Sequence, residues 1–335
     1  MKPSILNILL ATIISGVGFW GCLNEAERGN PLDPKSSNFK NVGSVSGRAV
    51  FMSSPLRGIG DVEVRLEPGP FITRTDANGL FRFEEIPVDT YSVNGYKEDF
   101  AKVQDTIVVS LGTTAELEMQ FNGLPRVTSV SVISLFMDRW FPDPLSALEV
   151  KAQVDDSDGF NDIALVEMTI PGIGFIDTLE FTQTPGLFQK TFAARNFPAQ
   201  KLHSVIGHEI FVQAKDRGGF TFTSPSKFVA RVIKELPKIL FPRAEQIITD
   251  VQPTLLWQAA ESVDFNYTYR IEMFRIDEIF ENLVFIKEGI SQNDTSFTVE
   301  ETLRSGTHFW TLRMTDEFGN WSRTREASFK INSGN

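Results

Sequence analysis

Short segments in which apolar and polar residues alternate recur along most of this chain. In "VEVRLE" the apolar positions are Val62, Val64 and Leu66, and charged residues stand between them. The same alternation returns in "LEVKAQV" and in "FWTLRM". A period of two places apolar side chains on one face of a β-strand. Turn-forming stretches such as "TDANG" separate these segments, so the sequence predicts an all-β chain built from sandwiches of short strands.

Size and cysteine content limit how such strands can be stabilised. The chain has 335 residues, enough for two or three domains, and Cys22 is its single cysteine. One cysteine excludes an internal disulfide framework and a zinc site built from several cysteines. Each domain must therefore depend on an apolar core.

The charge of the chain narrows the range of partners. The formal net charge is -11, and the sequence contains no basic cluster. Phosphate recognition and docking on an anionic membrane through a basic patch both need clustered Lys and Arg. We therefore expect no nucleic-acid partner.

Residues 1–21 are predicted to form a signal peptide. Lys2 precedes a mostly apolar run over residues 5–20, and the chain turns polar directly after Cys22. A run of this length is short for a transmembrane helix, which needs about 20 residues, and it fits the apolar region of a secretory signal.

The letters "FWGC" resemble the lipobox of bacterial lipoproteins, with Gly21 before the cysteine and Phe19 where the family most often has Leu. The resemblance implies cleavage before Cys22 and fatty acids, such as palmitate, on its sulfur and usually on the new N-terminus. Two or more acyl chains give stable anchoring. Because Leu23 follows, and not Asp, the resemblance implies the outer membrane, facing the periplasm or the cell surface. An uncleaved membrane anchor, or a buried cysteine without a special role, is the alternative.

Residues 44–121 are predicted to form the first sandwich, after a polar tether over residues 22–43. The strand and turn signals from "VSGRAV" through "TDANGLFRFEEIPVDTYSV" to "AELEMQF" closely resemble carboxypeptidase regulatory-like domains. The resemblance implies a transthyretin-like, or prealbumin-like, sandwich that acts as a non-catalytic accessory module. Asp76 and Asn78 are expected to shape a turn and not to bind a metal.

Residues 124–234 and 236–332 are predicted to form two further sandwiches, which makes three in tandem. The stretch "VKAQVDDSDGFNDIALVEM" resembles bacterial immunoglobulin-like domains. The last segment resembles fibronectin type III domains over nearly its whole length, which implies structural roles for Trp257 and Gly306. The family's corner tyrosine is missing, and His308 is expected to supply a polar contact in its place.

The acidic stretch "DDSDGFND" is the one candidate metal site. Carboxylate oxygens at such spacing are ligands that Ca²⁺ prefers. The stretch lacks the full EF-hand spacing and its closing Glu, so the pattern favours a plain acidic connection between strands. Asp156, Asp158 and Asp162 stay as the calcium candidates, with Asp155 beside them.

The stretch "FMDRWFPDP" places Trp140 and Phe141 among charged residues and prolines. In a loop, the two rings would form an aromatic contact patch, and we take them as candidate ligand-binding residues. The alternative is that they close the open end of a sandwich.

The sequence selects no catalytic residue and no cofactor. No pair of carboxylates is singled out for acid–base work, and His203 and His208 lack further zinc ligands. The metalloprotease HExxH pattern, the Walker loop and G-x-S-x-G are all absent.

We therefore expect a non-catalytic, lipid-anchored protein of the cell envelope. Its role would be that of a structural spacer or protein-binding module, with an envelope protein as the partner. The alternative is a polysaccharide-binding surface lipoprotein, for which Trp140, Phe141 and Trp321 are the aromatic candidates.

Overall fold

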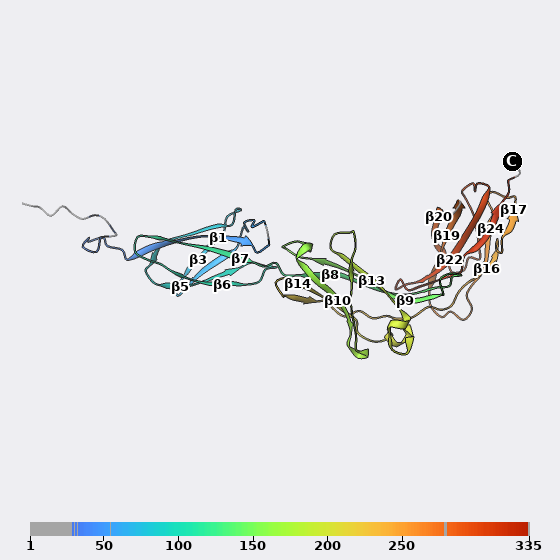
Figure 1. Ribbon diagram of the computed structural model, residues 1–335, viewed down its shortest axis with the longest axis horizontal. Helices are drawn as coiled ribbons and strands as arrows, with labels where there is room; N and C mark the ends of the chain where they lie inside the picture. Colours follow the sequence, from blue (N-terminus) through green and yellow to red (C-terminus); the bar gives the residue numbers. More distant parts are fainter. Residues whose placement is uncertain (1–28, 30, 32, 54, 278–279, 334–335) are drawn as a thin grey trace, which may run out of the picture.

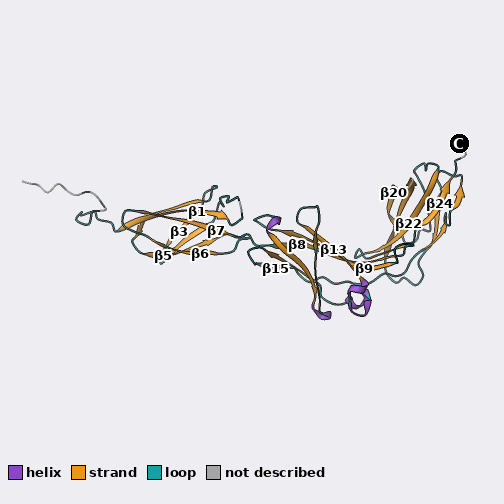
Figure 2. Ribbon diagram, viewed as in Figure 1, coloured by secondary structure: helices purple, strands orange, loops and turns teal. Residues whose placement is uncertain are grey.

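The computed structural model describes residues 29, 31, 33–53, 55–277 and 280–333. These residues form strands, turns and a few short 3-10 helices, which confirms the all-β prediction. The strands gather into three groups that follow one another in a row from the N-terminal to the C-terminal side (Figures 1 and 2). The predicted signal peptide and Cys22 lie outside the described residues.

The first group holds two sheets around one core. One sheet has the order β4-β1-β7, with β1 and β7 parallel, and the other has the order β3-β2-β5-β6. Val62, Val64 and Leu66, the alternating positions of the sequence, are all fully buried in this core. Its strands are β1 (Val42–Phe51), β2 (Glu63–Glu67), β3 (Phe71–Arg74), β4 (Leu80–Pro87), β5 (Thr90–Tyr96), β6 (Val103–Val108) and β7 (Thr114–Phe121).

Asp76 shapes the turn that leads into β4. Its Oδ1 accepts the backbone N–H of Asn78 and that of Leu80, each at 2.8 Å. Gly79 follows with φ +80°, a left-handed conformation that glycine adopts without steric cost. The turn chemistry expected from the sequence therefore accounts for Asp76.

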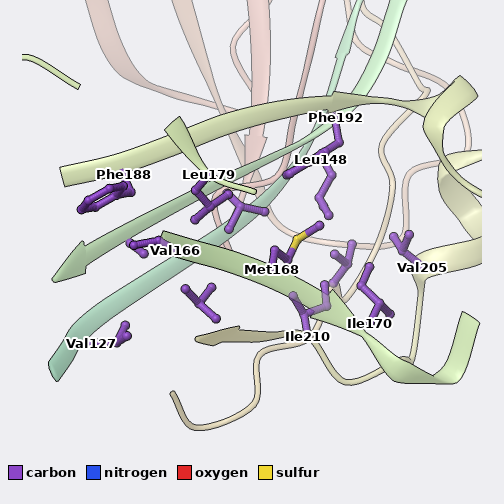
Figure 3. Close-up of a cluster of buried hydrophobic side chains, with 14 of the residues drawn as sticks. Val127, Leu148, Val166, Met168, Ile170, Leu179, Phe188, Phe192, Val205 and Ile210 are labelled. Carbon is purple, nitrogen blue, oxygen red and sulfur yellow. The ribbon is translucent and has the colours of Figure 1, made fainter. Parts of the chain in front are cut away.

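The second group packs the sheet β11-β10-β14-β15 against β12, β13, β9 and β8. Leu148, Val150, Ala152 and Val154 of β9 are fully buried between them, and Figure 3 shows Leu148 and Met168 meeting in this core. The strands are β8 (Arg126–Met137), β9 (Leu145–Asp155), β10 (Ile163–Ile170), β11 (Phe175–Thr178), β12 (Glu180–Phe181), β13 (Leu187–Ala193), β14 (Phe211–Asp216) and β15 (Thr221–Thr223).

The third group is built around Trp257, Tyr269 and Trp310, which are all buried. The Nε1–H of Trp310 donates to the Pro242 carbonyl at 2.9 Å, so the deepest indole keeps a hydrogen-bond partner. The strands are β16 (Lys238–Phe241), β17 (Gln246–Ile248), β18 (Thr254–Gln258), β19 (Tyr267–Asp277), β20 (Phe280–Ser291), β21 (Ser296–Thr298), β22 (Gly306–Asp316), β23 (Trp321–Arg323) and β24 (Ala327–Ile331).

One sheet runs through both the second and the third group. Strand β23 pairs in parallel with β8, from Trp321 opposite Leu135 to Arg323 opposite Met137. The pairing joins the strands into a ten-stranded sheet, in which eight strands follow the path β12-β13-β9-β8-β23-β22-β19-β20. The other two lie off this path: β24 pairs with β22, and β17 pairs with β24. The two apolar cores are separate, but the backbone hydrogen bonds are continuous across the predicted boundary at residues 234–236.

Candidate functional site

The segment between the first two groups is tied to the first one. Gly123 forms an antiparallel bridge with Phe100, and the Leu124 N–H donates to the Asp99 carbonyl at 2.8 Å. The Ala101 N–H donates to the Asn122 carbonyl at 2.9 Å. The chain therefore leaves the first sandwich as an extra piece of paired backbone and not as a free linker.

The acidic loop of the second sandwich meets this segment. One carboxylate oxygen from each of Asp156, Asp158 and Asp162 lies within 4.8 Å of the others. The second oxygen of Asp158, Oδ2, accepts the Gly123 N–H at 3.0 Å. Asp155 ends β9 with an exposed side chain and is not part of this group. Three of the four loop aspartates thus converge at the first junction.

Each of the three aspartates has one oxygen without a hydrogen-bond donor among the described residues. These atoms are Asp156 Oδ2, Asp158 Oδ1 and Asp162 Oδ2, and all three are buried. A buried oxygen that has lost water and gained no donor raises the free energy of the folded state. The arrangement therefore lacks positive charge at the point where the three oxygens meet.

A fourth aspartate, Asp216, lies beside the cluster but is fully partnered. Its Oδ1 accepts the Phe220 N–H at 2.7 Å, and its Oδ2 accepts the side-chain N–H of Asn122 at 2.6 Å. Asp216 and Asn122 are both buried, so this hydrogen bond fixes the first sandwich against the second.

Burial and mutual repulsion act on the carboxyl groups of the cluster. Burial, followed by the charges of Asp158, Asp162 and Asp216, raises the pKa of Asp156 to about 6. Burial also raises the pKa of Asp158 and of Asp162. Each effect disfavours the charged form, which a bound cation would favour.

Gly123 is the residue that allows the loop to come this close. A Cβ atom at this position would lie 2.7 Å from Asp156 Oδ1 and 2.8 Å from the Asp158 backbone nitrogen. Only glycine therefore fits at position 123 with the loop this close. Among the described residues, this is the one group of three or more His, Cys, Asp or Glu that could hold a metal ion.

The second candidate site is the aromatic loop after β8. Trp140 is 71% exposed and Phe141 is 89% exposed, so the rings do not close the end of a sandwich. The Nε1–H of Trp140 donates to the Glu326 carbonyl at 3.3 Å, and the Arg325 guanidinium lies over the indole, 4.6 Å from its centroid. Arg325 is held in turn by Asp138 at 2.7 Å. Trp140 is therefore exposed and yet fixed in orientation.

Trp321 does not extend this aromatic surface. The ring is partly buried on β23, and the Arg313 guanidinium lies over it at 4.2 Å. Within the described part of the chain, no ring contact joins Trp321 to Trp140 or Phe141. A flat platform of all three aromatic candidates is not formed.

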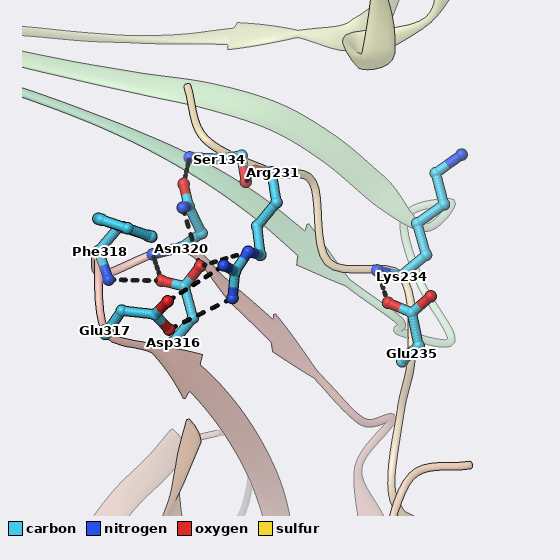
Figure 4. A network of polar contacts seen from close by, with 8 residues as sticks. All are labelled: Ser134, Arg231, Lys234, Glu235, Asp316, Glu317, Phe318 and Asn320. Carbon is cyan, nitrogen blue, oxygen red and sulfur yellow. Dashed lines mark hydrogen bonds and ion pairs between the residues drawn. The ribbon is translucent and has the colours of Figure 1, made fainter. Parts of the chain in front are cut away.

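Sequence reasoning missed the polar network at the second junction (Figure 4). Arg231 pairs with Glu317 at 3.1 Å and lies 3.6 Å from the buried Asp316. The Ser134 N–H on β8 donates to Asn320 Oδ1 at 2.9 Å. The stretch "DEFGN" signals only a turn, and its partners lie far away in the sequence, so no local signal marks them.

The two histidines of "KLHSVIGHEI" do not join a metal-binding group within the described residues. His203 lies in a 3-10 helix over Leu202–Val205, and the imidazole of His208 packs against Gly172. None of the helices in the described part of the chain has the length and apolar content needed to cross a membrane.

Comparisons with known proteins show a likeness of fold alone. No protein-family model and no curated protein matches the chain. The FN1–FN3 domains of chicken CNTN1 align with 83% of this chain and 92% of their own, at 12% identity and a TM-score of 0.35. BcpA, the major pilin subunit of Bacillus cereus, covers 87% and 93%, at 11% identity and a TM-score of 0.30. A DUF3823 family protein from Parabacteroides merdae covers 56% and 98%, at 12% identity and a TM-score of 0.23.

Proposed function

We propose that this protein is a non-catalytic spacer of the cell envelope, anchored by lipid at Cys22, that presents its C-terminal modules at a set distance from the membrane. The observation that carries the proposal is the ten-stranded sheet shared by the second and third groups. Domains joined by a linker move relative to one another by default. Backbone pairing between β8 and β23 opposes such motion at the second junction.

Side chains reinforce that pairing. The Ser134 Oγ–H donates to the Arg231 carbonyl at 2.8 Å, and the Ser322 Oγ–H donates to the Glu235 carbonyl at 2.6 Å. The Arg231 guanidinium lies over the Phe265 ring at 4.3 Å while it pairs with Glu317. A hinge at residues 231–235 would have to break these contacts together.

A divalent cation at the first junction is the second part of the proposal. Three buried oxygens without donors, with one aspartate also bonded to Gly123, would be satisfied by Ca²⁺. The ion would offset two of the three negative charges of the cluster and stiffen the contact between the first two sandwiches. The spacer role stands without the ion, since Asn122 and Asp216 already join the two sandwiches.

Distance measurements between paired spin labels test the spacer role. Two exposed sites on separate groups suit each junction: Val108 with Ile176 for the first, and Ile176 with Ile247 for the second. With cysteines at these sites in a Cys22→Ala background, we expect one narrow distance distribution for the second pair. A broad distribution for that pair would overturn the proposal.

Lipid attachment needs a separate experiment, because it rests on the lipobox resemblance. Labelled palmitate is expected on the wild-type protein in a bacterial host and is expected to disappear in Cys22→Ala. A wild-type protein that stays unlabelled, with its leader uncut, would contradict the anchor and leave the rigid row of sandwiches untouched.

Polysaccharide binding is the second candidate function. The observation in its favour is that Trp140 is exposed and yet held in one orientation by Arg325 and Glu326.

A further inference from the structure

A cavity of about 670 Å³ lies beside Trp140 at the second junction. It is bounded by the aromatic loop after β8, by the segment that enters β16, by the turn before β17 and by the start of β24. Leu236, Ile239 and Ala327 contribute apolar surface, and the Trp140 indole forms part of the wall. Ligand sites commonly combine such a volume with mostly apolar walls and a few placed polar groups.

Some polar groups of this cavity are paired within the protein, and others are exposed to solvent without a protein partner in the described part of the chain. Arg325 is paired with Asp138 at 2.7 Å, and the Glu326 carboxylate is paired with Arg323 at 2.8 Å. The Arg243 guanidinium and the Glu245 carboxylate have neither an ion pair nor a hydrogen bond within the described ranges. Both side chains are exposed, so one donor group and one acceptor group are accessible to a ligand that displaces water from them.

Arg243 and Glu245 stand on a turn whose backbone is fixed. Ala244 and Glu245 both have left-handed φ values, 51° and 57°, which cost free energy in residues other than glycine. The turn is held because the Glu245 N–H donates to the Ser328 carbonyl at 2.8 Å and the Arg243 N–H donates to Gln246 Oε1 at 3.0 Å. Strained backbone of this kind is concentrated at binding sites, and here it places both free polar side chains at the cavity.

We propose that this cavity binds a sugar ring of a neutral polysaccharide. Arg325 covers one face of the Trp140 indole, and the exposed remainder of the ring would take the C–H face of a pyranose. The hydroxyl groups of the sugar would accept from a guanidinium and donate to a carboxylate. Arg243 and Glu245 carry opposite charges, so together they add no net charge that would select a charged polymer. The net charge of -11 further disfavours an anionic polymer. This inference deepens the second candidate function, polysaccharide binding, and rests on it, but it does not depend on the spacer role.

Calorimetric titration of the full chain with neutral oligosaccharides tests the proposal. The probes are maltohexaose, cellohexaose, xylohexaose and mannohexaose, with oligogalacturonate as the acidic comparison. We expect binding of at least one neutral probe at millimolar concentration and none of the acidic one. Failure of all neutral probes, or binding of oligogalacturonate alone, would overturn the proposal.

Matched variants assign the binding to the cavity. Trp140→Ala and Arg243→Gln are each expected to weaken the affinity about tenfold or more. Phe141→Ala is the control, because this ring is in the same loop and fully exposed but does not line the cavity. All three side chains are on the surface, so a thermal melt is expected to show intact folding. Equal losses in Phe141→Ala and Trp140→Ala, or no loss in Trp140→Ala, would contradict the cavity as the site.

Failure of this experiment and failure of the spacer role are distinguishable. The distance distribution between sites 176 and 247 reports the rigidity of the junction whether or not a sugar binds. A rigid junction with no sugar affinity would leave the spacer role standing and remove only this inference.

Discussion

Three aspartates in one loop place more negative charge at the first junction than the neighbouring side chains neutralise. Asp156, Asp158 and Asp162 each keep one buried oxygen without a donor among the described residues. Arg57 and Arg217 lower the pKa of Asp158 and Asp162, but burial outweighs them and both pKa values are raised. We therefore expect the three aspartates of this loop to determine how the stability of the junction changes with added cations and with pH.

Calcium at millimolar concentration is expected to raise the Tm of the wild-type protein. Binding at a concentration well above Kd stabilises the folded state by about 1–3 kcal/mol. Asp162→Asn is expected to abolish the calcium response and, in EDTA, to raise the Tm slightly, because it removes one of the repelling charges. Differential scanning calorimetry measures both effects.

The control for this experiment is Asp155→Asn, an exposed neighbour outside the cluster. Its calcium response should equal that of the wild type. A wild-type Tm that does not change with calcium would mean that the loop is a plain acidic connection between strands.

The raised pKa of Asp156 predicts how the free energy of unfolding depends on pH when no cation is present. Its pKa of about 6 lies above the ordinary value of 3.8, so folding takes up a proton between these pH values. The contribution of Asp156 to the free energy of unfolding therefore falls as the pH rises from about 4 to about 6. Denaturant unfolding in EDTA should show this slope as the difference between the wild type and Asp156→Asn. A difference that is flat across this window would contradict the raised pKa.

At the scale of elements, the alternation of apolar and polar residues predicts which side chains of a strand are buried. It does not predict which strands pair with one another. The positions that the alternation marks, every second residue from Val62 to Leu66 and from Leu148 to Val154, are all buried, and β9 buries Ala147 as well. Nothing in the three residues of β23 indicates that they pair with β8. Parallel pairing between distant strands depends on backbone groups, which every residue carries.

The junction between β8 and β23 predicts the effect of one substitution. Asn320→Ala removes the acceptor of the buried Ser134 N–H and a donor to Asp316, at 2.9 Å and 3.1 Å. Leaving buried polar groups unpaired is expected to cost about 1–3 kcal/mol in the free energy of unfolding. Denaturant unfolding measures the loss, and the exposed Asn293→Ala is the control. Equal stabilities of the two variants would argue that the network does not hold the junction.

At the scale of the whole molecule, the row of sandwiches is the feature on which the proposed spacer role depends. The first sandwich lies at the N-terminal end of the row, and the shared sheet forms its C-terminal part (Figure 1). An exposed but fixed Trp140 lies at the second junction, well beyond the first sandwich in the chain. Under the proposed anchor at Cys22, this arrangement would keep Trp140 away from the membrane.

Cys22→Ala is expected to move the protein from the membrane fraction to the soluble fraction without changing its fold. Under the proposed anchor, the substitution removes the acyl chains that hold the protein to the bilayer, and every described strand begins later in the chain. Fractionation together with a thermal melt of the purified variant measures the two effects. A variant that stays in the membrane fraction would show that another segment provides the anchor.

The sequence alone predicted the features of this protein that depend on neighbouring residues. These are the all-β class, the alternating core positions, the turn at Asp76, and the acidic and aromatic loops. These depend on side-chain types at close spacing, which a linear string preserves. Only the folded chain brings Gly123 to the aspartates, Arg231 to Asp316, β23 to β8, and Arg243 to the cavity beside Trp140. Such contacts join residues far apart in the sequence, and their partners are selected by how the cores pack and not by any neighbouring residue.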